Sequence, residues 1–231
     1  MRICTVTVRA GSKGVPGKNW RPLRGIPLFA HSLLHAAESG LFERVAVSSD
    51  APEVLDTADR WGATDIIVRP PDLATDIAGK LPAIVHALLA VEAGAGRKSL
   101  TAVDLDATSP LRALSDIRGA VELLESTGAD SVITGAEAHR SPYFNLVEED
   151  PVTGVVALSK ATATGILRRQ DAPRAFDMNA SIYVWRRDAL VAEPRVFYPT
   201  TRLFEMPVER SHDIDSELDF DIVEWLMTRK A

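Results

Sequence analysis

The sequence predicts an α/β protein with one mostly parallel sheet between two layers of helices. Short runs of β-branched residues alternate with segments whose apolar residues recur every three or four positions. This alternation is typical of a three-layer sandwich, in which helices cover both faces of the sheet. With 231 residues, of which 46% are apolar and 25% charged, the chain has the length and composition of one globular domain with a sizeable core.

The predicted sheet is assembled from short apolar runs. We expect buried strands at Ile3–Val8, Val45–Ser48, Ile66–Val68, Thr101–Leu105 and Ser131–Thr134. We expect amphipathic helices at Leu28–Ser39, Glu53–Trp61, Pro82–Glu92 and Asp116–Ser126. Asp50 stands just before Ala51, Pro52 and Glu53, so it is expected to cap the second of these helices. Ligands of such sheets bind at the carboxyl ends of the strands.

Residues 139–174 interrupt the regular alternation of strands and helices. Prolines and glycines are frequent in this stretch, and its apolar runs, such as Val155–Leu158, are short and alternating. A layer of a core does not have this composition. We therefore expect an insertion of hairpins, which serves as a lid or as a dimerisation arm.

The regular pattern returns in the C-terminal part of the chain. Ala180–Trp185 is apolar and predicts a further strand, and Ser216–Met227 predicts a closing helix. Ser216 and Asp219 have the spacing of a capping box, with Asp in place of the usual Glu.

Net charge and cysteine content exclude several classes of protein. The formal net charge is −6, which argues against nucleic acids and anionic membranes as partners. Cys4 is the single cysteine, so a disulfide framework is impossible. The N-terminus has no signal-peptide pattern, and no stretch approaches the ~18 apolar residues of a membrane span. We expect a cytoplasmic protein.

The loop after the first strand, RAGSKGVPGKNW at residues 9–20, concentrates positive charge. Its glycines permit positive φ and close approach of backbone amides to an anion. Arg9, Lys13 and Lys18 supply the charge that a triphosphate needs. Neither a Walker A loop nor a Rossmann fingerprint fits, because Asn19 follows Gly17-Lys18 and the glycines are three apart. The loop predicts a phosphate site of another type, and the alternative is a solvated surface loop.

The stretch SHDIDSELDF, residues 211–220, places two carboxylates around one apolar residue. Asp213 and Asp215 share a face if the segment is extended, because side chains alternate along a strand. Mg²⁺ prefers oxygen ligands and is usually shared with substrate phosphates. The pair therefore predicts a magnesium site, and the alternative is one capping and one solvated aspartate.

Two more stretches contain candidate binding residues. Asp106 and Arg112, in DLDATSPLR after the fourth strand, are expected to face a polar ligand, although a strand-to-helix turn also explains the stretch. Asn179 enters an apolar strand, and Tyr183 follows four residues later. These two predict a pocket wall, and a core tyrosine is the alternative.

Four segments together resemble the acylneuraminate cytidylyltransferase family, the CMP-sialic acid synthetases. The pattern R-x-x-S-K-G-x-x-x-K-N is matched between Arg9 and Asn19, and T-S-P-L-R by Thr108–Arg112. D-I-D-x-x-x-D is matched between Asp213 and Asp219, and RPPDLATD at residues 69–76 is similar to R-P-x-x-L-A-x-D. The resemblance covers nearly the whole chain. It implies a single Rossmann-like nucleotidyltransferase domain over residues 1–231, a homodimer, and residues 139–174 as the dimerisation arm.

The resemblance also implies the reaction and the roles of residues. A 2-keto-3-deoxy sugar acid of nine carbons attacks the α-phosphate of CTP through its anomeric hydroxyl, pyrophosphate leaves, and a CMP-sugar forms. The implied catalytic residues are Arg9, Lys18 and Asp215, with Asp213 and Asp215 as ligands of Mg²⁺ and Asp215 or the metal easing deprotonation. The implied nucleotide-binding residues are Arg9, Ala10, Gly11, Ser12, Lys13, Lys18, Asn19, Arg69 and Asp76. The implied sugar-binding residues are Asp106, Thr108, Ser109, Arg112, Arg169, Asn179 and Tyr183.

Two departures from the family pattern affect the expected sugar. Asp106 stands where the sialic-acid enzymes usually have Gln, and a carboxylate only accepts hydrogen bonds whereas an amide also donates them. Phe144 stands where a sugar-site lysine is expected. We therefore expect a bacterial nonulosonate such as a legionaminic acid, with N-acetylneuraminic, pseudaminic and deaminated sialic acids as alternatives. The alternative functions are a 3-deoxy-octulosonate cytidylyltransferase and a non-catalytic nucleotide-sugar sensor.

Overall fold

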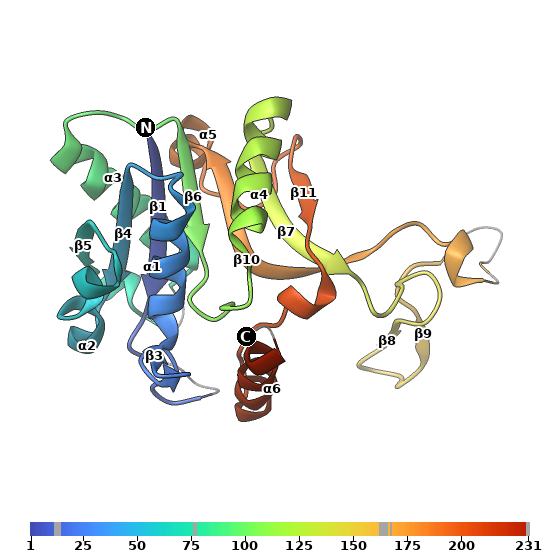
Figure 1. Ribbon diagram of the computed structural model, residues 1–231. Coiled ribbons are helices and arrows are strands. Elements are labelled where there is room, and N and C mark those ends of the chain that lie inside the picture. Colours follow the sequence, from blue (N-terminus) through green and yellow to red (C-terminus); the bar gives the residue numbers. More distant parts are fainter. Residues whose placement is uncertain (12–14, 76–77, 162–165, 167, 230–231) are drawn as a thin grey trace.

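The computed structural model describes residues 1–11, 15–75, 78–161, 166 and 168–229, and its centre is one seven-stranded sheet (Figure 1). The strand order is β11-β7-β10-β6-β1-β4-β5. The strands are β1 (Arg2–Val8), β4 (Arg44–Ser49), β5 (Asp65–Val68), β6 (Thr101–Leu105), β7 (Ser131–Glu137), β10 (Phe176–Arg186) and β11 (Arg202–Glu205). All neighbours in this sheet pair in parallel except β10, which is antiparallel to both β6 and β7. The predicted mostly parallel α/β sheet is confirmed.

Two layers of helices cover the sheet because alternate strand residues point to opposite faces. Val6, Val103 and Val184 face the layer that contains α1 (Leu28–Ser39) and α4 (Leu114–Thr127). Ile3, Ala102 and Trp185 face the other layer, which contains α3 (Lys80–Ala95) and α5 (Arg187–Ala192). Figure 1 shows α1 and α4 on the near face of the sheet.

The expected helix Glu53–Trp61 is wrong in extent. The structure has a short helix, α2 (Pro52–Leu55), and a separate 3₁₀ helix, η1 (Ala58–Trp61). Thr57 separates the two, and its side-chain hydroxyl donates to the carbonyl of Glu53 at 2.8 Å. This bond competes with continuation of the helix, as is usual for Thr side chains that bond to nearby backbone. η1 ends at Gly62, whose φ of 99° only glycine adopts without strain.

The cap expected from Asp50 is also wrong. Ala51 is the residue before α2, and no side chain caps this helix. The Asp50 carboxylate instead accepts a hydrogen bond from the backbone N–H of Ala10 at 2.8 Å. Asp50 therefore connects the end of β4 to the loop after β1.

The inserted segment between β7 and β10 forms a hairpin of its own. β8 (Val147–Glu149) pairs with β9 (Val156–Leu158) in an antiparallel sheet that contains no other strand among the described residues. Figure 1 shows this segment projecting away from the seven-stranded sheet. The expected hairpin is confirmed, and the expected role in dimerisation stays a prediction.

The last helix, α6 (Glu217–Arg229), covers the carboxyl ends of the strands together with the small hairpin of β2 (Pro22–Leu23) and β3 (Ile26–Pro27). Ile214, Phe220 and Val223 pack there against Leu23 and Leu28. The predicted capping box is confirmed, because the Asp219 N–H donates to the Ser216 hydroxyl at 3.2 Å and the Ser216 N–H donates to the Asp219 carboxylate at 2.7 Å. Of the helices described, none has the length and apolar character needed to cross a membrane.

Candidate active site

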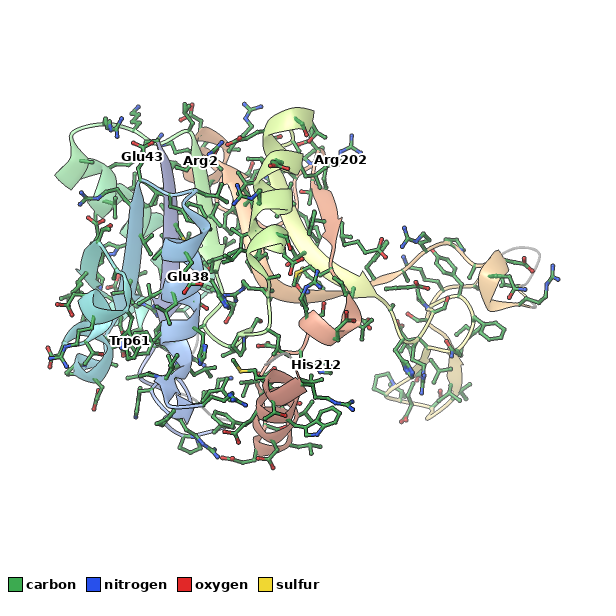
Figure 2. The ribbon with its side chains drawn as sticks, viewed as in Figure 1. Arg2, Glu38, Glu43, Trp61, Arg202 and His212 are labelled. Carbon is green, nitrogen blue, oxygen red and sulfur yellow. The ribbon has the colours of Figure 1, made fainter. Side chains whose placement is uncertain are left out.

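A cavity of about 510 Å³, the main cavity, lies at the carboxyl ends of β1 and β6. Its walls come from the loop after β1, residues 69–75 and 78–80 after β5, the turn 106–108 after β6 and the segment 213–215 before α6. Figure 2 labels His212, the neighbour of Asp213, between this end of the sheet and α6. The predicted site residues on its wall are Arg9, Gly11, Lys18, Asn19, Arg69, Asp106, Thr108, Asp213 and Asp215.

Lys18 joins the cationic loop directly to the pair of aspartates. Its ammonium donates to the carbonyl of Ile214 at 2.5 Å and lies 3.2 Å from a carboxylate oxygen of Asp215. The Lys18 side chain is largely buried, with 11% of its area exposed, whereas the side chain of Asp215 is 80% exposed. Lys18 and Asp215 are 197 residues apart in the chain, and their two charged segments therefore meet at one cavity.

The two ends of the loop after β1 are fixed by side chains. The Asn19 amide donates to the carbonyl of Arg9 at 2.9 Å, and Asp50 accepts from the N–H of Ala10. Gly17 has a φ of 68°, and a Cβ there would lie 3.2 Å from the Trp20 indole nitrogen. Asn19, which the resemblance assigns to the cytosine, thus has a structural bond at its amide nitrogen as well as a place on the cavity wall. Ser12 and Lys13 lie outside the described residues.

Arg69, in the segment after β5, adds a further cation to the cavity wall. Its guanidinium donates to the carbonyl of Ser48 at 2.8 Å, and the residue is only 7% exposed. Burial lowers the pKa of Arg69, while Asp50 and Asp104 act in the opposite direction. An arginine remains charged under such a shift, so the side chain is a fixed positive group on the cavity wall. Asp76, predicted from the same segment, lies outside the described residues.

The chemistry of Asp213 and Asp215 fits a hard divalent cation. Oδ1 of Asp213 is buried and has no hydrogen-bond partner within the described part of the protein. Burial raises the pKa of Asp213, although a hydrogen bond from Thr108 opposes this. The Ile214 N–H donates to the carbonyl of Thr108 at 3.0 Å, which holds the segment against the turn after β6. No group of three or more His, Cys, Asp or Glu suited to a metal is found among the described residues, so a cation here needs phosphate oxygens and water to complete its coordination.

Lys80 is a cavity residue that the sequence reasoning missed. Its ammonium lies 2.7 Å from Oδ2 of Asp104 and 2.6 Å from Oδ2 of Asp106. Burial lowers the pKa of Lys80, but the two carboxylates raise it by more, and the net effect is a raised pKa. For Asp106 burial acts to raise the pKa, and Lys80 and Thr108 outweigh it, so the net pKa is lowered. The expected helix began at Pro82, and that boundary left Lys80 in a loop, whereas α3 begins at Lys80 itself.

Arg112 and Ser109 do not face the main cavity. Arg112 is 2% exposed, and its guanidinium donates to the hydroxyls of Ser181 and Ser32 at 3.0 and 2.7 Å and to the carbonyl of Asp106. Burial lowers the pKa of Arg112 to about 10. Ser109 is 1% exposed. The expectation that Arg112 faces a ligand is therefore wrong. Its buried guanidinium instead holds the turn after β6 through the carbonyl of Asp106.

A second cavity of about 560 Å³ adjoins the first, and Asp213 and Asp215 line both. Asn179 is on its wall, where its amide donates to the Ser211 hydroxyl at 2.9 Å. The next residue, Ala180, has a φ of 51°, a left-handed conformation that costs energy for a residue with a side chain. It lies in the irregular part of β10, between Met178 and Tyr183. Strain at such a place is typical of functional sites.

Tyr183 and Arg169 are placed differently from Asn179. Tyr183 is 8% exposed, is stacked on Trp185 with ring centroids 5.4 Å apart, and is not on the wall of either cavity. The Lys80 ammonium lies 5.6 Å from the centre of its ring, so Tyr183 contacts a residue of the main cavity without lining it. Arg169 belongs to a short 3₁₀ helix, η3 (Arg169–Asp171), in the projecting segment, and its side chain is not described.

The sheet order, the cationic loop after β1 and the paired aspartates before α6 define an α/β nucleotidyltransferase. A family model described as cytidylyltransferase matches residues 3–226, and the chain belongs to this family.

Curated relatives agree over nearly the full length. The chain is 40% identical over 228 residues to a CMP-N,N'-diacetyllegionaminic acid synthase of Campylobacter jejuni, which covers 99% of this chain and 95% of the relative. It is 30% identical to a protein of the same name from Legionella pneumophila, with 98% and 97% covered. An N-acylneuraminate cytidylyltransferase of Streptococcus agalactiae is 30% identical over 94% of this chain and 51% of its own length.

Solved structures share the fold at lower identity. A CMP:2-keto-3-deoxy-manno-octonic acid synthetase complexed with CTP superposes with a TM-score of 0.73 at 17% identity, covering 100% of this chain and 99% of that one. A 4-diphosphocytidyl-2C-methyl-D-erythritol synthase from Anaerococcus prevotii gives a TM-score of 0.66 at 10% identity, with 99% and 98% covered. The expected Rossmann-like fold and the family resemblance are both confirmed.

Proposed function

We propose that the protein transfers CMP from CTP to the anomeric hydroxyl of a nonulosonic acid and releases pyrophosphate. The observation that carries this proposal is the contact between Lys18 and Asp215, which joins a phosphate-binding loop to a metal-binding pair on one cavity. The cavity volume of about 510 Å³ is in the range of small-molecule sites. The curated relatives have names that describe the same class of reaction.

The cations of the main cavity account for binding of the triphosphate. Arg9 and Lys18, in the loop after β1, both line this cavity. Nucleotidyl transfer needs fixed positive charge and in-line positioning more than covalent chemistry by the protein. In this proposal Asn19 and Arg69 contact the cytosine, and the backbone N–H of Gly11 donates to a phosphate oxygen. Ala10 takes part as a fixed point of the loop, because its own N–H donates to Asp50.

Asp213 and Asp215 would hold Mg²⁺ where the two cavities meet. When bound, the ion would neutralise negative charge that develops on the phosphate oxygens. The unpartnered Oδ1 of Asp213 is a free acceptor for such an ion, and the exposed carboxylate of Asp215 is the second. Asp215 is also the group assigned to accept the proton of the anomeric hydroxyl, directly or as a ligand of the ion.

The second cavity is the proposed sugar site. Among its described lining residues, four are acidic and none is Lys or Arg. Carboxylates accept hydrogen bonds from hydroxyl and acetamido N–H groups, which a nonulosonic acid presents in number. For a Lys or Arg partner, the sugar carboxylate depends on residues outside this lining. We propose that Arg169, in the projecting arm of a second copy, is that partner.

We propose a homodimer assembled through residues 139–174. The arm exposes more apolar side chains than a solvated hairpin needs. They have exposed fractions between 43% and 91% and are Val147, Val152, Val155, Val156 and Leu158. Exposed apolar patches of this kind mark interaction sites.

The sugar is proposed to be a legionaminic acid derivative, since the two relatives named for it cover nearly the whole chain. A cytoplasmic location stays a prediction from the sequence.

The experiment is an assay of pyrophosphate release with each nucleoside triphosphate, Mg²⁺ and a panel of eight- and nine-carbon keto acids. We expect turnover with CTP and a diacetylated legionaminic acid. Turnover restricted to the eight-carbon acid would contradict the proposed sugar, and CTP binding without turnover on any acid would contradict the proposed catalysis.

A matched pair of variants tests the metal assignment. Asp215→Asn keeps the shape of the side chain but removes its charge, so we expect kcat to fall by about 100-fold or more with the melting temperature unchanged. Asp221→Asn, on the exposed face of α6, serves as the control and should leave kcat unaltered. A near-normal rate for Asp215→Asn in Mg²⁺ would contradict the metal site.

A further inference from the structure

Lys80 occupies a place in the main cavity that neither the phosphate loop nor the metal pair explains. It is the first residue of α3, and the residues before it, Thr75, Ala78 and Gly79, line the same wall. Its ammonium forms ion pairs with Asp104 on β6, which is buried, and with Asp106 in the turn after β6, which lines the cavity. One nitrogen thus connects the start of α3 to the turn 106–108.

The charge balance of this cluster bears on the nucleotide. Asp104 is fully buried, and its other oxygen accepts from the Thr5 hydroxyl at 2.8 Å. Asp106 Oδ1 accepts from the N–H and hydroxyl of Thr108 at 3.0 and 2.8 Å. Asp106 lines the main cavity and Asp104 is buried behind the Lys80 ammonium. Without Lys80, both carboxylates would lie unbalanced at a cavity proposed to bind a polyanion, and like charges at short range repel.

We propose that Lys80 is a positioning residue of the main cavity: it balances the charge of Asp104 and Asp106 and connects the start of α3, with Ala78 and Gly79 before it, to the turn 106–108. This inference rests on the proposed binding of CTP. It also gives Asp106 a different role from the one expected from sequence, because both of its oxygens already have protein partners. A salt bridge that served only the fold would affect stability and not the affinity for an anionic ligand.

The experiment measures CTP binding by calorimetry in the presence of Mg²⁺, with kcat and the KM for each substrate measured in parallel. We expect Lys80→Met to raise the Kd for CTP about tenfold or more. The double variant Lys80→Met with Asp106→Asn should recover most of that loss, because one of the two unbalanced charges is removed. Lys98→Met, at an exposed position, is the matched control and should bind CTP as the wild type does.

Asp106→Asn alone keeps the inference testable if Lys80→Met does not fold. The amide oxygen can still accept from Thr108, and Lys80 still balances Asp104, so CTP should bind as tightly as to the wild type or more tightly. Weaker CTP binding by this variant would overturn the inference, as would an unchanged Kd in Lys80→Met or a double variant as weak as the single one. Failure of the wild type to bind CTP would instead overturn the proposed function, and this inference with it.

Discussion

At the scale of single residues, the polar side chains at strand ends were predictable as a set, but their partners were not. Arg9, Lys18, Asp213 and Asp215 were predicted because their types and spacing point to phosphate and metal. Asp50 was predicted to be a helix cap because local order in the chain was the only information available. In the structure it bonds to Ala10, 40 residues away, and a contact of that range is decided by the register of neighbouring strands.

Asp50 gives a prediction about the loop after β1. Asp50→Ala removes the acceptor for the Ala10 N–H, so the loop should lose a fixed point and the KM for CTP should rise about fivefold to tenfold, as for loss of a partly buried hydrogen bond. Asp50→Asn keeps an acceptor oxygen and should remain within about twofold of the wild type. Equal KM values for the two variants would show that the bond does not position the loop. Steady-state kinetics with CTP varied is the measurement.

At the scale of elements, the long helices α1, α3, α4 and α6 and the parallel strands β1, β4, β5, β6 and β7 were predicted from their own apolar patterns. The parallel strand β11 and the helix α5 were not predicted, and the expected helix Glu53–Trp61 is two short helices. β10 was recognised only in part, as Ala180–Trp185, since its first residues carry polar side chains near the second cavity. Its antiparallel direction follows because the arm returns the chain to the end of the sheet at which β7 finishes. Contacts between helices, such as the pair of Glu92 on α3 and Arg187 on α5, have no local signal.

The Glu92–Arg187 pair gives a prediction about stability. Both groups are nearly buried, and the carboxylate also accepts from the N–H and hydroxyl of Ser99 at 2.8 and 2.7 Å. Glu92→Ala leaves Arg187 without its main partner and should lower the free energy of unfolding by about 3 kcal/mol. Glu38→Ala, on the exposed side of α1 (Figure 2), should change it by less than about 0.5 kcal/mol. Urea denaturation measures both values.

The same pair predicts the pH dependence of this loss. Burial acts to raise the pKa of Glu92, but the bonds from Arg187 and Ser99 outweigh it and lower the pKa. The unfolded chain therefore binds the proton more readily, and the contribution of Glu92 is present at neutral pH and lost as the pH falls through the lowered pKa. The difference between wild type and Glu92→Ala should shrink below about pH 4, near the ordinary value for Glu. A difference independent of pH would contradict an ionised Glu92.

At the scale of the whole molecule, the charges of the two cavities and of the arm have to be considered together. The cavities share Asp213 and Asp215, yet the second has no Lys or Arg among its described lining residues, while the arm contains several. Arg140, Lys160, Arg168 and Arg174 all lie in the arm, which projects from the end of β7 (Figure 1). In a single chain, the cavity proposed as the sugar site therefore has only His139 and His212 as basic side chains among its described lining residues, and the apolar face of the arm is exposed. The sequence showed the break in pattern at residues 139–174 but not this complementarity, which depends on where the arm points.

The final prediction concerns this complementarity. Val156→Asp places a charge on β9 within the exposed apolar face of the arm, where it should oppose packing against a second copy. We expect light scattering to report a dimer for the wild type and a monomer for the variant, with an unchanged melting temperature for the seven-stranded domain. If the partner's arm supplies the cation for the sugar acid, the variant should show a KM for the sugar raised about tenfold or more and a Kd for CTP close to the wild-type value. Val68→Asp, at an exposed position on the edge strand β5, controls for a new surface charge. A monomeric wild type, or a monomeric variant with normal sugar kinetics, would contradict the shared site, because each chain would then complete its own second cavity.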